Sequence, residues 1–394
     1  MTHSTYLIVG GGMAAAAAMN GLRDVDPHGS IGLISMEAHP PYKRPPLSKG
    51  LWKGDALDSI WNGMDSRGVE LHLGRTAVTL DPRKKRVVDD RGTVYSFDKL
   101  LLATGGTPRR LSFGDDKVLY YRTLDDYRRL RTLADQRQRF AVIGGGFIAS
   151  EIAAALRMNG KEVVMLFPGA EIGGRQFPHD LAHFLTNFYR QKGIDVLSGE
   201  TISGVDARGE RLTVQTQSAR EILVDGVVAG IGIQPRIALA QEAGLEVARG
   251  VVVDEALRTS HPDIYAAGDV AEFYDPTLGV RRRVEHEDNA NTMGWVAGRV
   301  MAGDAQAYHH LPFFYSDLFE LGYEAVGDID ARLETMADWK EPFQEGVIYY
   351  MQAGRVRGVL LWNVWGQVDT ARRLIAEPGP YQPADLVGRL PMTA

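Results

Sequence analysis

Two stretches of the chain share one pattern of hydrophobic and polar positions. In the first, an apolar run at residues 6–10 enters a turn of three consecutive glycines, and an alanine-rich segment then predicts a helix to about residue 22. A second apolar strand at residues 30–34 is followed by the acidic residue Glu37. This order is typical of a dinucleotide-binding βαβ unit, in which the glycines let the backbone approach a pyrophosphate at the helix N-terminus and the acid binds a ribose.

The pattern recurs about one domain later. An apolar strand at residues 140–144 again enters three consecutive glycines, and a helix to about Asn159 and a strand at residues 162–167 follow. An internal repeat of this kind predicts that one chain holds two dinucleotides. The predicted fold is therefore α/β, with two Rossmann-like domains.

The segment between the two units has the alternation of antiparallel strands. Residues 77–80 and 86–89 alternate apolar and polar positions, and residues 95–103 predict a further strand. The basic run at residues 83–86 has the composition of a nuclear-localisation or nucleic-acid patch, but we interpret it as the solvated turn of a hairpin.

The remainder of the chain predicts a second meander and a third domain. Residues 213–216 and 222–228 are interpreted as strands of the meander, and from about Asp317 onward no further dinucleotide turn occurs. The elements expected in this last part are two strands and a helix, at residues 346–351, 355–361 and 367–375. Such a mixture predicts a C-terminal α+β domain.

Composition narrows the possible chemistry. The chain has 394 residues, a net charge of −6 and no Cys. The acidic balance argues against a general nucleic-acid binder. The absence of Cys excludes a redox-active disulfide, a thiolate nucleophile and thiolate-ligated zinc or iron–sulfur clusters. Chemistry must therefore depend on a cofactor or on carboxylate, His, Lys and hydroxyl groups.

Neither a membrane segment nor a metal site is expected. No apolar run reaches the roughly 18–20 residues that a membrane helix requires, so we expect a soluble, cytoplasmic protein. His179 and His183 are spaced by four residues and could share a zinc ion. Their flanking residues are polar and no third ligand is evident, so no metal is predicted.

The order of the motifs resembles one family, the pyridine nucleotide oxidoreductases with two dinucleotide-binding domains. A first glycine turn, an Ala-Thr-Gly at residues 103–105, a second glycine turn and a late Gly-Asp at residues 268–269 follow one another as in that family. Residues 41–49 are similar to the ferredoxin-reductase branch. Five later stretches resemble the apoptosis-inducing-factor branch, at residues 166–168, 282–286, 314–318, 322–325 and 359–363.

The resemblance implies three domains and two cofactors. Residues 1–117 and 248–316 would form an FAD-binding domain, residues 118–247 an NAD(P)-binding domain, and residues 317–394 the C-terminal α+β domain. NAD(H) is the expected second cofactor. NADP(H) stays open, because the second strand of the NAD unit ends in Phe167 where many reductases have an acid.

The implied activity is transfer of hydride from NAD(P)H to flavin and of electrons to a ferredoxin, a quinone or a similar acceptor. The alternative is a redox switch like apoptosis-inducing factor, with slow NADH oxidation, a stable flavin–NAD charge-transfer complex and redox-linked oligomerisation. A homodimer is compatible with either of these two functions. The basic run at residues 281–283 would attract an acidic carrier, or would be a solvated strand edge.

Three residues are the catalytic candidates that the resemblance implies: Lys49, Glu151 and His286. Lys49 and Glu151 would face each other at the flavin edge, where a buried pair neutralises both charges and places a cation near the site of reduction. His286 would lie beside the flavin or the nicotinamide, and the helix after it would direct its positive end at the flavin.

The remaining candidates are assigned to the two nucleotides. The set expected around FAD comprises Gly10, Gly12, Ala15, Glu37, Arg44, Lys49, Ala77, Ala103, Thr104, Gly105, Arg122, Gly268, Asp269, Glu285 and His286. The set expected around the nicotinamide nucleotide, or between it and the flavin, comprises Gly144, Gly146, Phe147, Ile148, Glu151, Arg175, Gly232 and Tyr315. Tyr315 stands where the ferredoxin-reductase branch has Trp.

Overall fold

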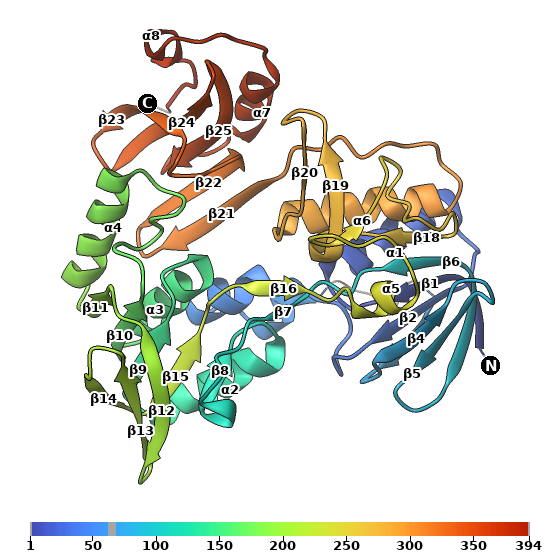
Figure 1. Ribbon diagram of the computed structural model, residues 1–394, viewed down its shortest axis with the longest axis horizontal. Coiled ribbons are helices and arrows are strands. Elements are labelled where there is room, and N and C mark those ends of the chain that lie inside the picture. Colours follow the sequence, from blue (N-terminus) through green and yellow to red (C-terminus); the bar gives the residue numbers. More distant parts are fainter. Residues whose placement is uncertain (1, 62–67, 393–394) are drawn as a thin grey trace. The chain divides into compact units, whose positions relative to one another are not determined.

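The computed structural model describes residues 2–61 and 68–392, which fold as two compact units (Figure 1). The first unit consists of Met1–Arg44, Leu57–Thr107 and Gln234–Phe313. The second consists of Pro45–Ala56, Pro108–Ile233 and Phe314–Ala394. The chain passes from one unit to the other along β7 (Gly106–Pro108) and β16 (Ile233–Pro235), which pair as a two-stranded sheet. The division into three domains stays a prediction.

A seven-stranded sheet forms the core of the first unit, in the order β3-β2-β1-β6-β5-β4, with β18 also paired to β6. These strands are β1 (Thr2–Val9), β2 (Ile31–Ser35), β3 (Val69–Leu73), β4 (Ala77–Asp81), β5 (Arg86–Asp89), β6 (Val94–Leu102) and β18 (Ile264–Ala266). Because β2, β1, β6 and β18 are parallel, their carboxyl ends meet at one edge of the sheet. The predicted cofactor residues that follow these strands are thereby gathered at that edge.

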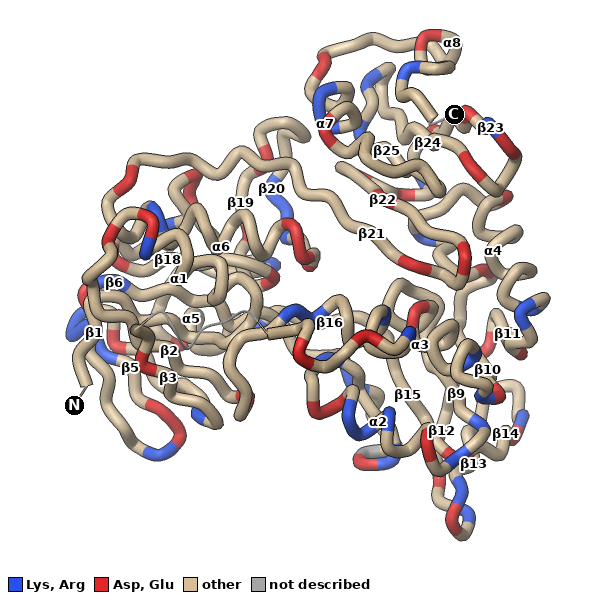
Figure 2. The backbone as a smooth tube through the Cα atoms, turned by 180° about the vertical axis from the view of Figure 1, so that it is seen from behind, with Lys and Arg blue, Asp and Glu red and all other residues tan. Residues whose placement is uncertain are grey.

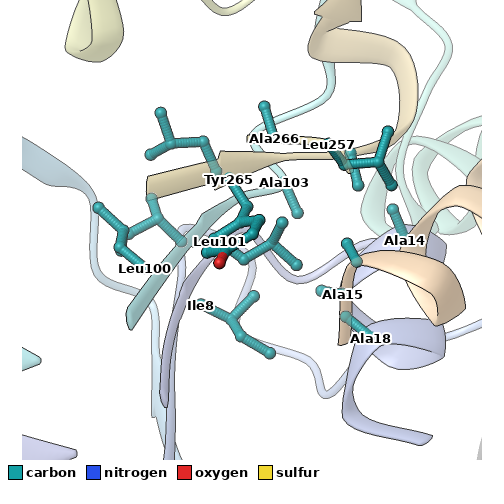
Figure 3. Close-up of a cluster of buried hydrophobic side chains, with 14 of the residues drawn as sticks. Ile8, Ala14, Ala15, Ala18, Leu100, Leu101, Ala103, Leu257, Tyr265 and Ala266 are labelled. Atoms are coloured by element: carbon teal, nitrogen blue, oxygen red, sulfur yellow. The ribbon is translucent and has the colours of Figure 1, made fainter. Parts of the chain in front are cut away.

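Helices α1 (Met13–Val25) and α6 (Glu287–Met301) of the first unit pack closely because small residues line their contact. A Cβ atom on Gly294 would lie 2.2 Å from the carbonyl oxygen of Ala14, and one on Gly298 would lie 2.1 Å from that of Ala18. Figure 3 shows Ala14, Ala15 and Ala18 in the apolar core with side chains of β6 and β18. The alanines and glycines thus hold α6 against the first dinucleotide unit.

The basic run at residues 83–86 lies in a hairpin turn, as predicted, because β4 and β5 pair in antiparallel fashion on either side of it. Lys85 of this turn and Lys99 of β6 bind the two carboxylate oxygens of Asp263, at 2.6 and 2.8 Å. The two cations lower the pKa of Asp263 to about 2, although partial burial acts in the opposite direction.

This ion-pair cluster predicts a loss of stability in acid. Because the folded-state pKa of Asp263 lies below its ordinary value, its contribution is present above about pH 4 and disappears as the pH falls towards 2. Asp263→Asn is expected to remove this part of the acid sensitivity, measured by urea unfolding between pH 5 and pH 3. Replacing the exposed Asp98 by Asn is the control. Identical pH profiles for wild type and Asp263→Asn would contradict the expectation.

A five-stranded parallel sheet forms the core of the second unit, in the order β11-β10-β9-β15-β8. Its strands are β8 (Val118–Tyr120), β9 (Arg139–Ile143), β10 (Glu162–Phe167), β11 (Ile194–Ser198) and β15 (Gly226–Ala229). Its helices are α2 (Leu124–Gln136), α3 (Phe147–Met158) and α4 (His179–Gln191). The second glycine turn joins the central strand β9 to α3, as the repeat predicted.

The interpretation of residues 222–228 as one strand was wrong. The segment divides at Asp225 into β14 and β15, which belong to different sheets. Asp225 causes the break because its carboxylate accepts backbone N–H groups of Gln138 and Arg139 and binds Arg211. The strand before the break, β14 (Glu221–Val224), belongs to an antiparallel sheet with β12 (Ile202–Arg208) and β13 (Arg211–Thr216).

The C-terminal part of the second unit is an antiparallel sheet in the order β21-β22-β25-β24-β23. Its elements are β21 (Phe313–Leu318), β22 (Leu321–Gly327), β23 (Glu334–Glu341), β24 (Glu345–Gln352), β25 (Arg355–Trp362), α7 (Val368–Ala376) and α8 (Pro383–Leu386). The two predicted strands and the predicted helix correspond to β24, β25 and α7. The α/β fold with a C-terminal α+β part is therefore confirmed.

The smaller elements complete the two units. They are α5 (Ala238–Glu242), β17 (Val251–Val252), β19 (Ala271–Asp275), β20 (Val280–Arg282), and the short 3₁₀ helices η1 (Pro45–Ser48), η2 (Gly50–Trp52), η3 (Leu57–Ile60), η5 (Asp115–Lys117) and η6 (Gly268–Val270). Basic and acidic residues are interspersed along the chain (Figure 2). Within the described residues, no helix combines the length and the apolar character that crossing a membrane requires.

Candidate functional site

The first glycine turn leaves space for a ligand at the N-terminus of α1. Gly10 has a φ of +125°, and a Cβ atom there would lie 2.1 Å from the carbonyl oxygen of Ala103 at the end of β6. A Cβ atom on Gly12, by contrast, would meet no atom within 4 Å. No side chain caps α1 and no acid occurs in its first turn, so its N-terminal N–H groups suit an anion such as a pyrophosphate.

The acid expected at the ribose and the Arg expected at the pyrophosphate bind each other. The carboxylate of Glu37 pairs with the guanidinium of Arg44 and accepts a hydrogen bond of 2.5 Å from the Tyr42 hydroxyl. Burial acts to lower the pKa of Arg44, but the charge of Glu37 raises it above its ordinary value. The structure therefore brings these two candidates together as an ion pair.

Other candidates lie at the same edge of the first sheet. The backbone N–H of Ala103 bonds to the carbonyl of Val9 at 2.8 Å, and the Thr104 hydroxyl donates to the carbonyl of Arg236 at 2.9 Å. Gly105 also has a positive φ, of +62°. Gly268 and Asp269 form η6 directly after β18. A Cβ atom on Gly10 would lie 3.1 Å from the backbone nitrogen of Thr104, and one on Gly268 would lie 2.9 Å from the Cβ atom of Ala14 in α1.

The residues before α6 are tied to η6. Arg283 donates to the carbonyl oxygen of Asp269 at 2.9 Å and pairs with Glu285 at 2.5 Å. His286 occupies the N-cap position of α6, whose first turn contains Glu287 and Asp288. The arrangement places Asp269, Glu285 and His286 in one region of the first unit.

The strongest polar cluster of the second unit surrounds Glu151. The carboxylate pairs with the Lys49 ammonium at 2.7 Å and accepts hydrogen bonds of 2.6 Å from the hydroxyls of Ser48 and Ser316. Only 3% of the Glu151 side chain and 12% of the Lys49 side chain are exposed. The Lys49 ammonium also lies 5.1 Å from the ring centre of Tyr315, within reach of a cation–π contact. Three donors thus bind this buried carboxylate.

Three distant segments build this cluster. Glu151 lies one turn into α3, Ser48 and Lys49 lie at the end of η1, and Ser316 lies on β21. The resemblance predicted the pairing of Lys49 with Glu151, but Ser48 and Ser316 were not predicted. In the sequence, these two serines are marked only by standing next to the candidates Lys49 and Tyr315.

Aromatic side chains cover one side of the Glu151 cluster. The ring of Phe147 contacts those of Phe314 and Tyr323, with ring centres 5.2 and 6.3 Å apart. Burial raises the pKa of Tyr323 well above its ordinary value, and the negative charge of Glu151 adds to the shift. The Tyr189 hydroxyl donates to the carbonyl of Ser150, and its pKa is raised by the same two causes. These two phenols therefore stay protonated.

The second glycine turn repeats the geometry of the first. A Cβ atom on Gly144 would lie 2.4 Å from the carbonyl oxygen of Gly230, whereas one on Gly146 would meet no atom within 4 Å. No side chain caps α3 and its first turn has no acid, so this helix end also suits a pyrophosphate. Ile148 in the first turn of α3 is 42% exposed.

Four further candidates occupy the following places in the structure. Ala15 is fully buried in α1, and Ala77 is half-buried on β4. Arg122 precedes α2, and its backbone N–H donates to Asp126 at 3.0 Å. The carbonyl of Gly232 accepts the N–H of Arg109 at 2.9 Å. For these positions the proposed contacts with nucleotide stay predictions.

The basic run at residues 281–283 and the histidine pair at residues 179 and 183 each allowed two interpretations. Both contain side chains that bind other residues of the chain. Arg282 of β20 pairs with Asp275 at 3.3 Å and Arg281 donates to a backbone carbonyl, which favours the strand-edge interpretation of the basic run. His183 binds Glu171 at 2.9 Å. No group of three metal-ligating side chains occurs among the residues that the structure describes.

Fold and site together define a class of protein. A mixed sheet and a parallel sheet each carry an uncapped helix behind an open glycine turn, and a buried Lys–Glu pair lies at the start of the second of these helices. This is the architecture of a redox protein that holds two dinucleotides.

Residues 4–294 match the family described as pyridine nucleotide-disulphide oxidoreductase, and residues 297–342 and 337–377 match the C-terminal family of apoptosis-inducing factor, mitochondrion-associated. The chain belongs to the pyridine nucleotide-disulphide oxidoreductase family, as the motifs predicted.

Individual relatives extend over nearly the whole chain. Apoptosis-inducing factor 1, mitochondrial, of Dictyostelium discoideum is 36% identical, over 94% of this chain and 78% of its own length. The ferredoxin–NAD(+) reductase component of the 3-phenylpropionate/cinnamic acid dioxygenase of Photorhabdus laumondii is 31% identical, over 96% and 98%. The structure is similar to the covalent putidaredoxin reductase–putidaredoxin complex, with a TM-score of 0.91 and 28% identity over 98% and 96% of the two chains.

Family membership confirms the predicted cofactors, FAD and NAD(P)H, and the oxidoreductase class. The open glycine turns and the uncapped helices fit such nucleotides. The family description includes disulphide chemistry, but this chain contains no Cys, so it has no redox-active disulfide of its own.

Proposed function

We propose that this chain transfers electrons from a reduced nicotinamide nucleotide, through FAD, to a ferredoxin-like protein. The observation that carries the proposal is the buried Lys49–Glu151 pair at the start of α3, combined with the absence of any thiol that could receive the electrons. The names of the relatives from Photorhabdus laumondii and of the putidaredoxin reductase complex support a small iron–sulfur protein as acceptor.

The residues of the chain would bind, orient and balance charge. The redox chemistry, uptake of a hydride from the nicotinamide and release of single electrons, would be supplied by FAD. The helix ends at Gly12 and Gly146 would hold the two pyrophosphates. Lys49 would supply a fixed positive charge where negative charge develops, and Glu151 would keep that ammonium in position. Ser48 and Ser316 would in turn hold Glu151.

The proposal is tested with the FAD-loaded protein in the absence of oxygen. NADH is added in stopped flow while flavin absorbance is followed, and an oxidised ferredoxin with a [2Fe–2S] cluster is then mixed in. We expect flavin reduction at about 1 s⁻¹ or faster and reoxidation on a similar timescale. Reduced flavin that persists for minutes in the presence of ferredoxin would overturn the proposal.

The second candidate is the redox switch, and the match of residues 297–342 and 337–377 to the C-terminal family of apoptosis-inducing factor favours it. In that case the same experiment would show slow reduction and a lasting long-wavelength charge-transfer band. Sedimentation before and after reduction would reveal a change of oligomer. A homodimer and a cytoplasmic location both stay predictions.

A further inference from the structure

The end of β10 lacks the acid that selects NADH in many dinucleotide-binding units. In such units a carboxylate after the second strand binds the 2′-hydroxyl of the adenosine ribose, and the same charge repels the 2′-phosphate of NADPH. Here β10 ends in the buried Phe167, whose ring lies 2.9 Å from the position that a Cβ atom on Gly145 would take. The next three residues, at 168–170, are exposed and carry no charge.

The first acid after β10 is turned into the protein. Only 14% of the Glu171 side chain is exposed, and His183 of α4 lies 2.9 Å from one carboxylate oxygen. The other oxygen is shut off from solvent. Burial acts to raise the pKa of Glu171, but the hydrogen bond with His183 lowers it below its ordinary value. Glu171 is therefore a charged carboxylate that is bound to α4. Neither of its oxygens is available to a bound ribose, because one binds His183 and the other is buried.

The first acid after the neighbouring strand β11 is also engaged. Glu200 is 11% exposed, and its two carboxylate oxygens accept hydrogen bonds of 2.9 and 2.7 Å from the Ser218 hydroxyl. The guanidinium of Arg220 lies 3.0 Å from the first of these oxygens and offsets the charge. Neither β10 nor β11 is therefore followed by a free carboxylate that would repel a phosphate.

A cation stands beside the same turn. The N–H of Gly173 donates to the carbonyl oxygen of Gly145 at 2.9 Å, which holds the turn containing Arg175 against the second glycine turn. The Arg175 side chain is exposed, and its guanidinium forms no hydrogen bond or ion pair within the part of the chain that the structure describes. A guanidinium without a carboxylate partner is well suited to bind a phosphate.

From these observations we infer that the nicotinamide-nucleotide site of this chain admits the 2′-phosphate, so that NADPH is a substrate together with NADH. This inference rests on the proposed function and specifies its electron donor. Arg175 is the residue that would pair with the 2′-phosphate. The absence of an acid at residues 167–170 removes the repulsion that would otherwise exclude this phosphate.

Gly169 permits a matched pair of variants. A Cβ atom there would have only ordinary contacts, at 3.8 Å to the Phe167 ring and 3.9 Å to the carbonyl oxygen of Glu171. Gly169→Glu adds a carboxylate two residues after the end of β10, and Gly169→Gln adds an uncharged side chain of the same length. Arg175→Gln and Arg175→Lys test the cation separately. FAD content and urea unfolding verify that each variant is folded.

The first measurement is binding, which does not depend on turnover. Calorimetric titration of the oxidised, FAD-loaded wild type with NAD⁺ and with NADP⁺ is expected to give Kd values within about tenfold of each other. AMP and 2′-phospho-AMP, which are fragments of the two nucleotides, are also expected to give Kd values within about tenfold of each other. Gly169→Glu should raise the Kd for NADP⁺ by about tenfold or more relative to Gly169→Gln. Arg175→Gln should raise the Kd for NADP⁺ more than that for NAD⁺, and Arg175→Lys should recover part of the loss.

The second measurement is anaerobic flavin reduction by NADH and by NADPH. If NADH binds and reduces the flavin whereas the Kd for NADP⁺ exceeds that for NAD⁺ by clearly more than tenfold, the inference is overturned and the proposed function survives. If both nucleotides bind equally but neither reduces the flavin, the proposed function fails although the site admits the phosphate. Equal binding of the two nucleotides, together with flavin reduction by both NADH and NADPH, supports the inference as well as the proposed function.

Discussion

Glu151→Ala is expected to lower the free energy of unfolding by about 3 kcal/mol, because it leaves a buried ammonium without its counter-charge. The Lys49 side chain is only 12% exposed, and the hydroxyls of Ser48 and Ser316 lose their common acceptor at the same time. The rate of flavin reduction by NADH should fall by about 10²-fold, since the cation loses the group that positions it. Urea denaturation and anaerobic stopped flow measure the two effects.

Two further variants separate charge from position. Glu151→Gln removes the charge, keeps one oxygen that accepts from a serine and replaces the other oxygen by an NH2 donor, so it should be less destabilised than Glu151→Ala. Adding Lys49→Met to Glu151→Ala removes the unpaired cation and should restore part of the stability. A double-mutant cycle over Lys49 and Glu151 then gives their coupling, for which we expect about 1–3 kcal/mol. Unfolding and reduction kinetics equal to wild type in Glu151→Ala would refute the role of the pair.

Gly10→Ala and Gly12→Ala are expected to fail in different ways, although the two glycines are separated by one residue. At Gly10 the backbone has a positive φ and a methyl group would overlap the carbonyl of Ala103, so we expect a loss of about 3 kcal/mol in unfolding free energy. At Gly12 the methyl group meets no protein atom. This variant should unfold within about 0.5 kcal/mol of wild type.

The two variants should also differ in their affinity for FAD. The methyl group of Gly12→Ala would enter the space that the structure leaves open at the N-terminus of α1. We expect the Kd for FAD to rise by about tenfold or more while the fold is intact. Reconstitution of the apoprotein with FAD, followed by flavin fluorescence, measures this affinity. Normal FAD binding by a folded Gly12→Ala protein would show that the open turn does not hold the pyrophosphate.

The sequence was informative wherever the chemistry depends on neighbouring residues. Both glycine turns, the strands and helices around them and the hairpin at residues 83–86 follow from local patterns of apolar, small and turn-forming residues, and the structure contains all of them. The resemblance also predicted the pairing of Lys49 with Glu151, over a separation of 102 residues. Periodicity failed at residues 222–228, because the acceptor Asp225 ends one strand by binding residues of a distant one.

The sequence by itself thus determined the class of fold, the two glycine turns and the exclusion of thiol chemistry, since each depends on residue type and local order. Only the tertiary structure decided that Ser48 and Ser316 join Glu151, that Glu37 binds Arg44, and that Glu171 is withdrawn against α4. These contacts join side chains whose partners depend on how strands and helices pack. A local pattern records which residues prefer a strand, a turn or a helix, but it does not record which distant side chain completes a buried charge.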